Sequence, residues 1–219
     1  MKENYELRKV ARDALDGNWF PAIIACLVYG IISGIIGAVP IAGFILAIFL
    51  TGPLMLGFTG FFVELVRNDK KELNTLFSGF NNYFRSFTLA LLRCVFTILW
   101  LLLLIVPGII ASYSYAMSFY ILKDNPGMDA LDVIRKSKEM MKGKKWKLFV
   151  LQLSFIGWLL LAIITLGIGL LFLVPYYCSA EAAFYEDLKK GSPAEITEKK
   201  PRSKASGKAT KTVARKKKK

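Results

Sequence analysis

The chain has 219 residues, of which 54% are hydrophobic, and its formal net charge is +14. This composition excludes an ordinary soluble domain, because the apolar residues come in long blocks and do not alternate with polar ones. All charges fall in four polar stretches, and the three stretches between them carry none: residues 17–63, 94–122 and 148–180. The layout predicts an all-α integral membrane protein, since each block is long enough to cross a bilayer at least once.

Three polar stretches predict amphipathic helices at the membrane surface. Residues 4–16 place their apolar side chains on one face and end at Gly17. Residues 70–84 and 126–142 follow the same plan. Basic flanks suit such helices to the headgroup boundary of the bilayer.

Each charge-free block predicts a hairpin of two membrane-spanning helices, which gives about six spans. The turns are expected at Val39–Gly43, Val106–Gly108 and Thr165–Gly169, where glycine or proline interrupts the apolar run. In chain order, the four polar stretches hold 4, 5, 8 and 13 of the 30 Lys and Arg residues. Because basic stretches resist translocation, hairpins would keep all four, and both termini, in the cytoplasm.

The second block leaves an alternative open. It has 29 charge-free residues, whereas two full spans need about 40. Its first helix would have to begin near Ser86, which places Arg93 about two turns inside the helix, a depth from which Arg can snorkel to the interface. An arrangement of four or five spans with a re-entrant segment is the alternative.

Five positions are candidates for a helix break: Gly52, Pro53, Pro107, Gly108 and Pro175. A proline inside a helix removes one backbone hydrogen bond and leaves a carbonyl about four residues earlier without its donor. Such a carbonyl can face a transported ion or substrate, but proline kinks are also ordinary in membrane helices. We favour ordinary packing at these positions and keep transport as the alternative.

Nothing in the sequence indicates catalysis. Histidine is absent, which removes the commonest general base and the commonest metal ligand. The three cysteines are isolated in apolar segments, and no nucleotide-binding glycine loop or hydrolase motif occurs. The acids near the membrane are interpreted as solvated helix ends: Glu64, Glu181, Glu186 and Asp187. We therefore expect no enzyme, no metal and no cofactor.

A set of basic and aromatic residues is expected at the inner membrane interface: Arg85, Arg93, Lys144, Lys145, Trp146 and Lys147. Such side chains can hold lipid phosphates, and simple anchoring of the helices is the alternative. The expected partners are therefore membrane lipids with anionic headgroups. A protein partner or a second copy of the chain is a further expectation.

The chain divides into a membrane domain, residues 1–190, and a Lys-rich tail, residues 191–219. Within the domain one pattern recurs about every 60 residues: an amphipathic helix, a glycine with an aromatic residue, an apolar hairpin and an aromatic pair. This pattern predicts three repeats, about 1–66, 67–125 and 126–190, although interfacial aromatics are general in membrane proteins. The tail is predicted to be disordered and cytoplasmic, as a topology anchor or a lipid contact, with nucleic acid as a third alternative.

Seven short motifs occur together in the chain: Gly17–Trp19, Leu76–Phe80, Pro107–Ile110 with Tyr115–Met117, Leu122–Pro126, Met140–Gly143, Leu153–Trp158 and Pro175–Tyr176. Together they resemble a family of Gram-positive bacterial integral membrane proteins known only as a domain of unknown function, over roughly residues 1–190. The resemblance implies a multi-span protein of the bacterial plasma membrane. It is similar in layout to the membrane domain that precedes some glycerophosphodiester phosphodiesterases, but we expect no such hydrolase domain here and carry over no catalytic residue.

The expected function is non-enzymatic: the protein interacts with lipids or scaffolds a partner in the membrane. A small transporter or channel is the alternative. A transporter would enclose a polar cavity near Phe49–Pro53, whereas a scaffold would be packed there.

Overall fold

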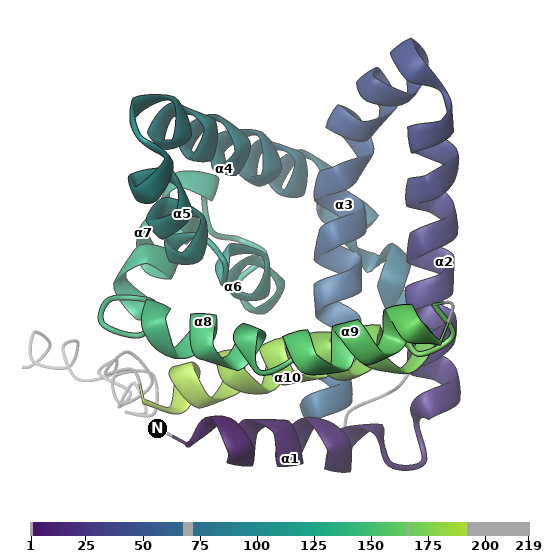
Figure 1. Ribbon diagram of the computed structural model, residues 1–219. Coiled ribbons are helices and arrows are strands. Elements are labelled where there is room, and N and C mark those ends of the chain that lie inside the picture. The colour runs from purple at the N-terminus through teal and green to yellow at the C-terminus, as the bar shows by residue number, and fades with distance from the viewer. Residues whose placement is uncertain (1, 68–71, 166, 192–219) are drawn as a thin grey trace, which may run out of the picture.

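The computed structural model describes residues 2–67, 72–165 and 167–191, and in these ranges it contains helices and no strand (Figure 1). The elements in chain order are α1 (Asn4–Leu15), α2 (Trp19–Ala38), α3 (Pro40–Arg67), the 3-10 helix η1 (Leu73–Asn82), α4 (Tyr83–Leu103), α5 (Ile105–Ser114), α6 (Ser118–Asp124), α7 (Ala130–Met140), α8 (Lys145–Leu153), α9 (Ile156–Ile164) and α10 (Leu170–Lys190). The predicted tail lies outside the described residues, apart from Gly191.

Within the described residues, five helical segments are long and apolar enough to cross a membrane: Trp19–Ala38, Gly43–Arg67, Leu73–Leu103, Ile105–Asp124 and Lys145–Ile164. The prediction of an all-α membrane protein is confirmed, and the segments indicate a multi-pass protein. The sixth expected span corresponds to α10, which is apolar only as far as Ala180. Its second half carries Glu181, Glu186 and Asp187, so the apolar part of this helix is shorter than the roughly 20 residues of a typical spanning helix.

The hairpin turns fall close to the expected positions. Helices α2 and α3 meet at Val39, and α9 meets α10 within residues 165–169, where Gly167 has a φ of +86°. The second turn differs from the prediction, because it lies at Leu104, two residues before Val106. Pro107 and Gly108 belong to the first turn of α5, where proline is tolerated because the first N–H groups of a helix have no intrahelical acceptor.

The other candidate break positions lie within continuous helices: α3 runs through Gly52 and Pro53, and α10 runs through Pro175. Around Pro53 the backbones are in close contact. A Cβ on Gly52 would lie 2.4 Å from the carbonyl oxygen of Ser86 in α4, and a Cβ on Gly79 would lie 1.9 Å from that of Pro53. These glycines therefore let α3 pack directly against η1 and α4.

The predicted amphipathic stretches form α1, η1 and α7. Helix α1 packs on α10 and buries Leu7, Ala11 and Leu15 completely. Gly17 follows α1 and Gly143 follows α7, and both have a φ of +72°, which favours glycine. Each surface element is thus followed by a hairpin, although the threefold repeat itself stays a prediction.

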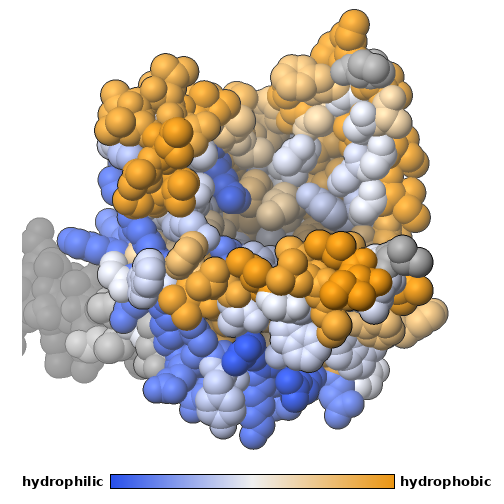
Figure 2. Space-filling model, in the orientation of Figure 1, coloured by the Kyte–Doolittle hydropathy of each residue, from blue (hydrophilic) through white to orange (hydrophobic). Residues whose placement is uncertain are grey.

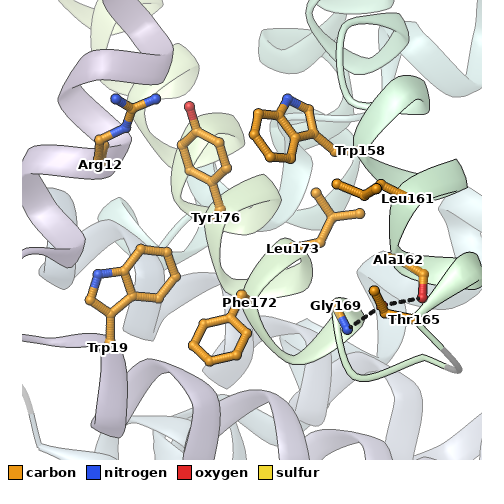
Figure 3. Close-up of a pocket in the computed structure, with 10 residues that line it drawn as sticks. All are labelled: Arg12, Trp19, Trp158, Leu161, Ala162, Thr165, Gly169, Phe172, Leu173 and Tyr176. Carbon is orange, nitrogen blue, oxygen red and sulfur yellow. Dashed lines mark hydrogen bonds between the residues drawn. The ribbon is translucent and has the colours of Figure 1, made fainter.

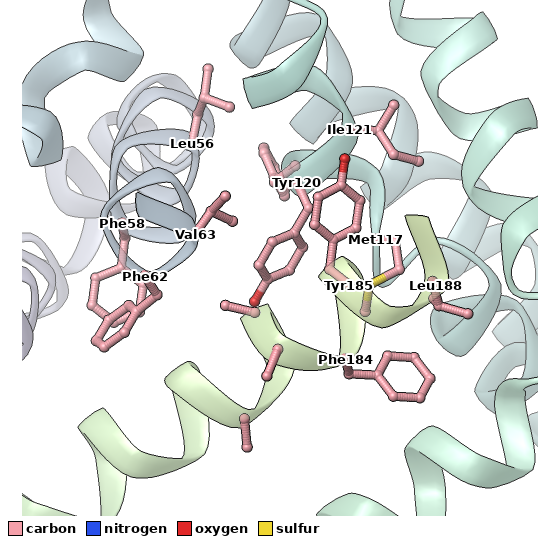
Figure 4. Close-up of a cluster of buried hydrophobic side chains, with 14 of the residues drawn as sticks. Leu56, Phe58, Phe62, Val63, Met117, Tyr120, Ile121, Phe184, Tyr185 and Leu188 are labelled. Atoms are coloured by element: carbon pink, nitrogen blue, oxygen red, sulfur yellow. The ribbon is translucent and has the colours of Figure 1, made fainter. Parts of the chain in front are cut away.

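The core lies where the three hairpins end. Aromatic side chains of α3, α6 and α10 meet there, with Phe62, Tyr120 and Phe184 at most 4% exposed (Figure 4). The ring centroids of Tyr120 and Tyr185 are 5.3 Å apart. The hairpin turns, by contrast, expose apolar side chains such as Leu102, which is 83% exposed. Apolar surface of this kind suits lipid rather than water.

Candidate functional site

Charged side chains join the three hairpin exits in a group that we call the exit cluster: Arg67, Asp124, Tyr185, Glu186 and Lys189. Arg67 donates through both terminal nitrogens to the two oxygens of Asp124, each at 2.8 Å, and its Nε donates to Glu186 at 2.8 Å. Lys189 and the Tyr185 hydroxyl also donate to Asp124, at 2.9 Å and 2.8 Å. Bidentate pairs of this kind are the stronger and more directional ion pairs.

The exit cluster is electrically balanced, with two cations facing two carboxylates. Burial raises the pKa of the Tyr185 hydroxyl, which lies in the charged half of α10, and the neighbouring Asp124 carboxylate raises it further. Tyr185 therefore remains a hydrogen-bond donor at neutral pH. Because the charges are matched within the chain, the cluster favours a structural role over ligand binding.

Two further polar contacts lie beside the exit cluster. Lys123 pairs with Glu64 at 2.9 Å, and Glu64 also accepts a hydrogen bond from Thr75 at 2.7 Å. The interpretation of the exit acids as solvated helix ends was therefore wrong for Glu64 and Glu186, which form ion pairs. One local signal pointed to this arrangement. An aromatic pair near each hairpin exit is followed within six residues by charges of both signs: Phe61–Phe62, Phe119–Tyr120 and Phe184–Tyr185.

A polar chain connects α5, α8 and α10. The Tyr113 hydroxyl donates to Gln152 at 2.7 Å, and Gln152 donates to Glu181 at 2.8 Å. Tyr177 donates to the same oxygen of Glu181 at 2.8 Å. Glu181 is thus a hydrogen-bonded acceptor between helices and not a solvated helix end.

The structure distributes the predicted headgroup contacts over separate places. Arg85 donates to the carbonyl of Pro126, and Lys147 donates to the carbonyl of Lys2. Arg93 lies 5.6 Å from the ring centroid of Phe119, a cation–π distance. Lys144 and Trp146 are exposed, and Lys145 is half-buried. Of this set, Arg85, Lys144 and Trp146 are exposed, and of these three Arg85 is held by the carbonyl of Pro126.

A groove that the sequence did not predict runs between α1, α9 and α10, and we call it the α1 groove (Figure 3). Its outer part, of about 350 Å³, is lined by Tyr5, Arg8, Lys9, Arg12, Asp13, Trp158 and Tyr176. Its inner part, of about 540 Å³, is lined by Arg12, Trp19, Trp158, Leu161, Ala162, Thr165, Gly169, Phe172, Leu173 and Tyr176. The two parts share Arg12, Trp158 and Tyr176, so they are neighbouring hollows that border the same three side chains.

Local geometry builds this groove. The left-handed turn at Gly17 redirects the chain after α1, so that Trp19 begins α2 and lies 5.9 Å from Phe172 of α10, measured between ring centroids. In the α9–α10 turn, the Thr165 hydroxyl donates to the Ala162 carbonyl at 2.9 Å and accepts from the N–H of Gly169 at 3.1 Å. These contacts hold the apolar wall of the groove in place.

The groove combines two kinds of surface. Its outer part carries three cations and one carboxylate, and among the described residues none of these three cations forms a salt bridge. Its inner part is lined mostly by apolar and aromatic side chains. Residues 5–19 meet residues 158–176 here, and three of the short sequence motifs contribute a lining residue: Trp19, Trp158 and Tyr176. No group of three or more potential metal ligands occurs among the described residues.

Neither a curated protein nor a solved structure matches the chain. One family model does match, over residues 1–111 and 93–192, which together include all described helices. Its description is that of a protein of unknown function, DUF975. The chain therefore belongs to the DUF975 family of proteins of unknown function.

Proposed function

We propose that this protein is a non-enzymatic integral membrane protein that binds and organises anionic lipids, or scaffolds a partner, in the bacterial plasma membrane. Both termini would lie in the cytoplasm. The layout similarity to the membrane domain of some glycerophosphodiester phosphodiesterases supports the membrane role and contributes no activity.

The division of the surface carries this proposal. The polar face of α1 makes the lower part of the molecule hydrophilic, and the apolar side chains of α9 lie directly above it (Figure 2). On α1, Arg8, Lys9 and Arg12 line the hollow beside that boundary. A basic band next to an apolar surface matches the level of anionic headgroups, where each basic residue contributes about 1 kcal/mol of attraction.

The alternative of a small transporter or channel has less support. It requires a polar cavity near Phe49–Pro53, but Gly52 lies too close to the backbone of α4 to accept even a Cβ. Phe49 of α3 stacks on Phe87 of α4, with 5.3 Å between the ring centroids. The close contact of Gly52 with α4 favours a scaffold.

The lipid environment of the full chain tests the proposal. The protein is placed in vesicles of equimolar phosphatidylglycerol and phosphatidylcholine and extracted with its surrounding lipids in polymer nanodiscs. We expect phosphatidylglycerol to exceed its share in the vesicle, and the excess to fall with added salt because exposed charges are screened. Lipid extracted in the vesicle ratio at low salt would refute the proposal.

The expected orientation has its own test. In a cysteine-free background, single cysteines at Ala42 and at Leu104, the observed second turn, should react with an impermeant thiol reagent applied to intact cells, whereas cysteines at Lys71 and Gly127 should not. Labelling of Lys71 or Gly127 from outside would contradict cytoplasmic basic loops, because these two positions lie in the polar stretches.

A further inference from the structure

We propose that the α1 groove holds one phospholipid molecule, with its phosphate at Arg12 and one acyl chain in the inner part of the groove. The inference rests on the proposed lipid-binding function and assigns it a specific site. Three observations support it: cations line the outer part, apolar side chains line most of the inner part, and the two parts share three lining residues.

The polar groups gather at one end of the groove. In Figure 3 the guanidinium of Arg12, the hydroxyl of Tyr176 and the indole of Trp158 lie together, above the apolar side chains. Arg8 and Lys9 line the outer part beside them. A planar guanidinium binds phosphate through two parallel hydrogen bonds, and the remaining cations add attraction for a negative headgroup.

The inner part has the properties of a site for a hydrocarbon chain. Its volume of about 540 Å³ falls in the range of small-molecule sites, about 300–1,000 Å³. Leu161, Phe172 and Leu173 line it, and the neighbouring Leu160 and Ile164 of α9 are 58% and 77% exposed. An acyl chain could therefore enter from the lipid that surrounds α9 without crossing water.

The shared border of the two parts favours a lipid over a soluble anion. Arg12, Trp158 and Tyr176 border both parts, so a ligand held by Arg12 sits at the entrance of the apolar space. A free phosphate would leave that space empty. A phospholipid fills both parts at once, with its phosphate at the cations and its acyl chain against the apolar side chains.

Native mass spectrometry of the full chain tests the site. Protein delipidated in detergent is titrated with dioleoyl phosphatidylglycerol, dioleoyl phosphatidylcholine and soluble glycerol phosphate. We expect one phosphatidylglycerol to bind more tightly than further copies and more tightly than phosphatidylcholine. Glycerol phosphate should not displace it, and displacement by this soluble headgroup would refute the acyl-chain site.

Two matched pairs of variants identify the groove. Arg12→Gln should weaken phosphatidylglycerol binding about tenfold, since a charge-assisted hydrogen bond is lost. Arg135→Gln, which removes an exposed Arg on α7, should have no effect. Leu161→Trp should fill the inner part and weaken both lipids, whereas Leu160→Trp, at a neighbouring position that does not line the groove, should not. Wild-type affinity in both Arg12→Gln and Leu161→Trp would overturn the proposal.

A chain-length series needs no mutation and covers the case in which Leu161→Trp does not fold. Affinity should rise from dihexanoyl to dioleoyl phosphatidylglycerol if a chain enters the groove, and equal affinities would refute it. The nanodisc measurement separates this site from the proposed function. Lipid enrichment without a tightly bound molecule would remove the groove site alone, while absence of enrichment would remove the broader function.

Discussion

The exit cluster and the α1 groove both gather charges where segments distant in sequence meet, but one is satisfied within the chain and the other is not. In the exit cluster two cations face two carboxylates, and the side chain of Asp124 is only 10% exposed. In the groove, three cations and one carboxylate lie beside an apolar hollow. Matched buried charges point to a role in stabilising the fold, whereas unmatched charges beside an open space point to a ligand-binding site.

The largest effect is expected from removing the central cation of the exit cluster. Arg67→Ala leaves Asp124 and Glu186 without their main partner, and breaking such a pair costs about 3 kcal/mol of unfolding free energy. Arg67 is 27% exposed, whereas the control residue Arg135 is 71% exposed. Arg135→Ala should cost about 0.5 kcal/mol or less. Chemical unfolding in detergent measures both, and equal losses would contradict a structural role for the cluster.

A smaller loss is expected where α3 packs against η1. Gly79→Ala puts a Cβ against the carbonyl of Pro53, and such overpacking lowers the free energy of unfolding by about 2 kcal/mol. Gly127→Ala is the control, because no atom lies within 4 Å of the added Cβ. The same unfolding assay compares them. A Gly79→Ala variant as stable as Gly127→Ala would show that this contact is not tight.

A substitution in the groove should change the free energy of unfolding only when lipid is present. A ligand at a hundredfold excess over its Kd stabilises a protein by about 2.7 kcal/mol, and a tenfold weaker Kd removes about 1.4 kcal/mol of that. Arg12→Gln should therefore match the wild type in pure detergent and lose about half of the stabilisation by phosphatidylglycerol. An equal loss without lipid would instead assign Arg12 to the structure.

The smallest effect concerns one hydrogen bond of the exit cluster. Tyr185→Phe removes the donor to Asp124 and should cost about 1 kcal/mol of unfolding free energy. Tyr5→Phe, at the exposed rim of the groove, should cost nothing measurable in the absence of lipid. If both substitutions were neutral, the buried hydrogen bond would contribute no net stability.

Much of the fold could be predicted because it is encoded locally. Charge-free blocks identify the apolar helices, and Gly17 identifies the end of α1. The second turn was misplaced because proline was interpreted as the break, although Pro107 fits the first turn of α5 and the chain turns at Leu104. The sequence pattern places the charges after Ala180 in a polar stretch that follows a sixth span. In the structure these charged residues belong to α10, the same helix as the apolar residues before them.

The candidate site could not be predicted in the same way. Arg67 lies 57 residues before Asp124 and 119 residues before Glu186, so no periodicity links them. The same holds for Arg12 and Phe172, which lie on opposite sides of one groove. Periodic patterns identify which face of a helix is buried, but the helix that covers that face depends on the tertiary arrangement.

The sequence separations in the exit cluster also bear on how the molecule is made. At a synthesis rate of about 5–20 residues per second, Arg67 is complete roughly ten seconds before Glu186, which lies 119 residues later. During that interval the first hairpin carries a guanidinium that lacks one of its two acidic partners. The first two hairpins can pair through Arg67 and Asp124 before the final helix is made, whereas the third hairpin joins them only after Glu186 has emerged.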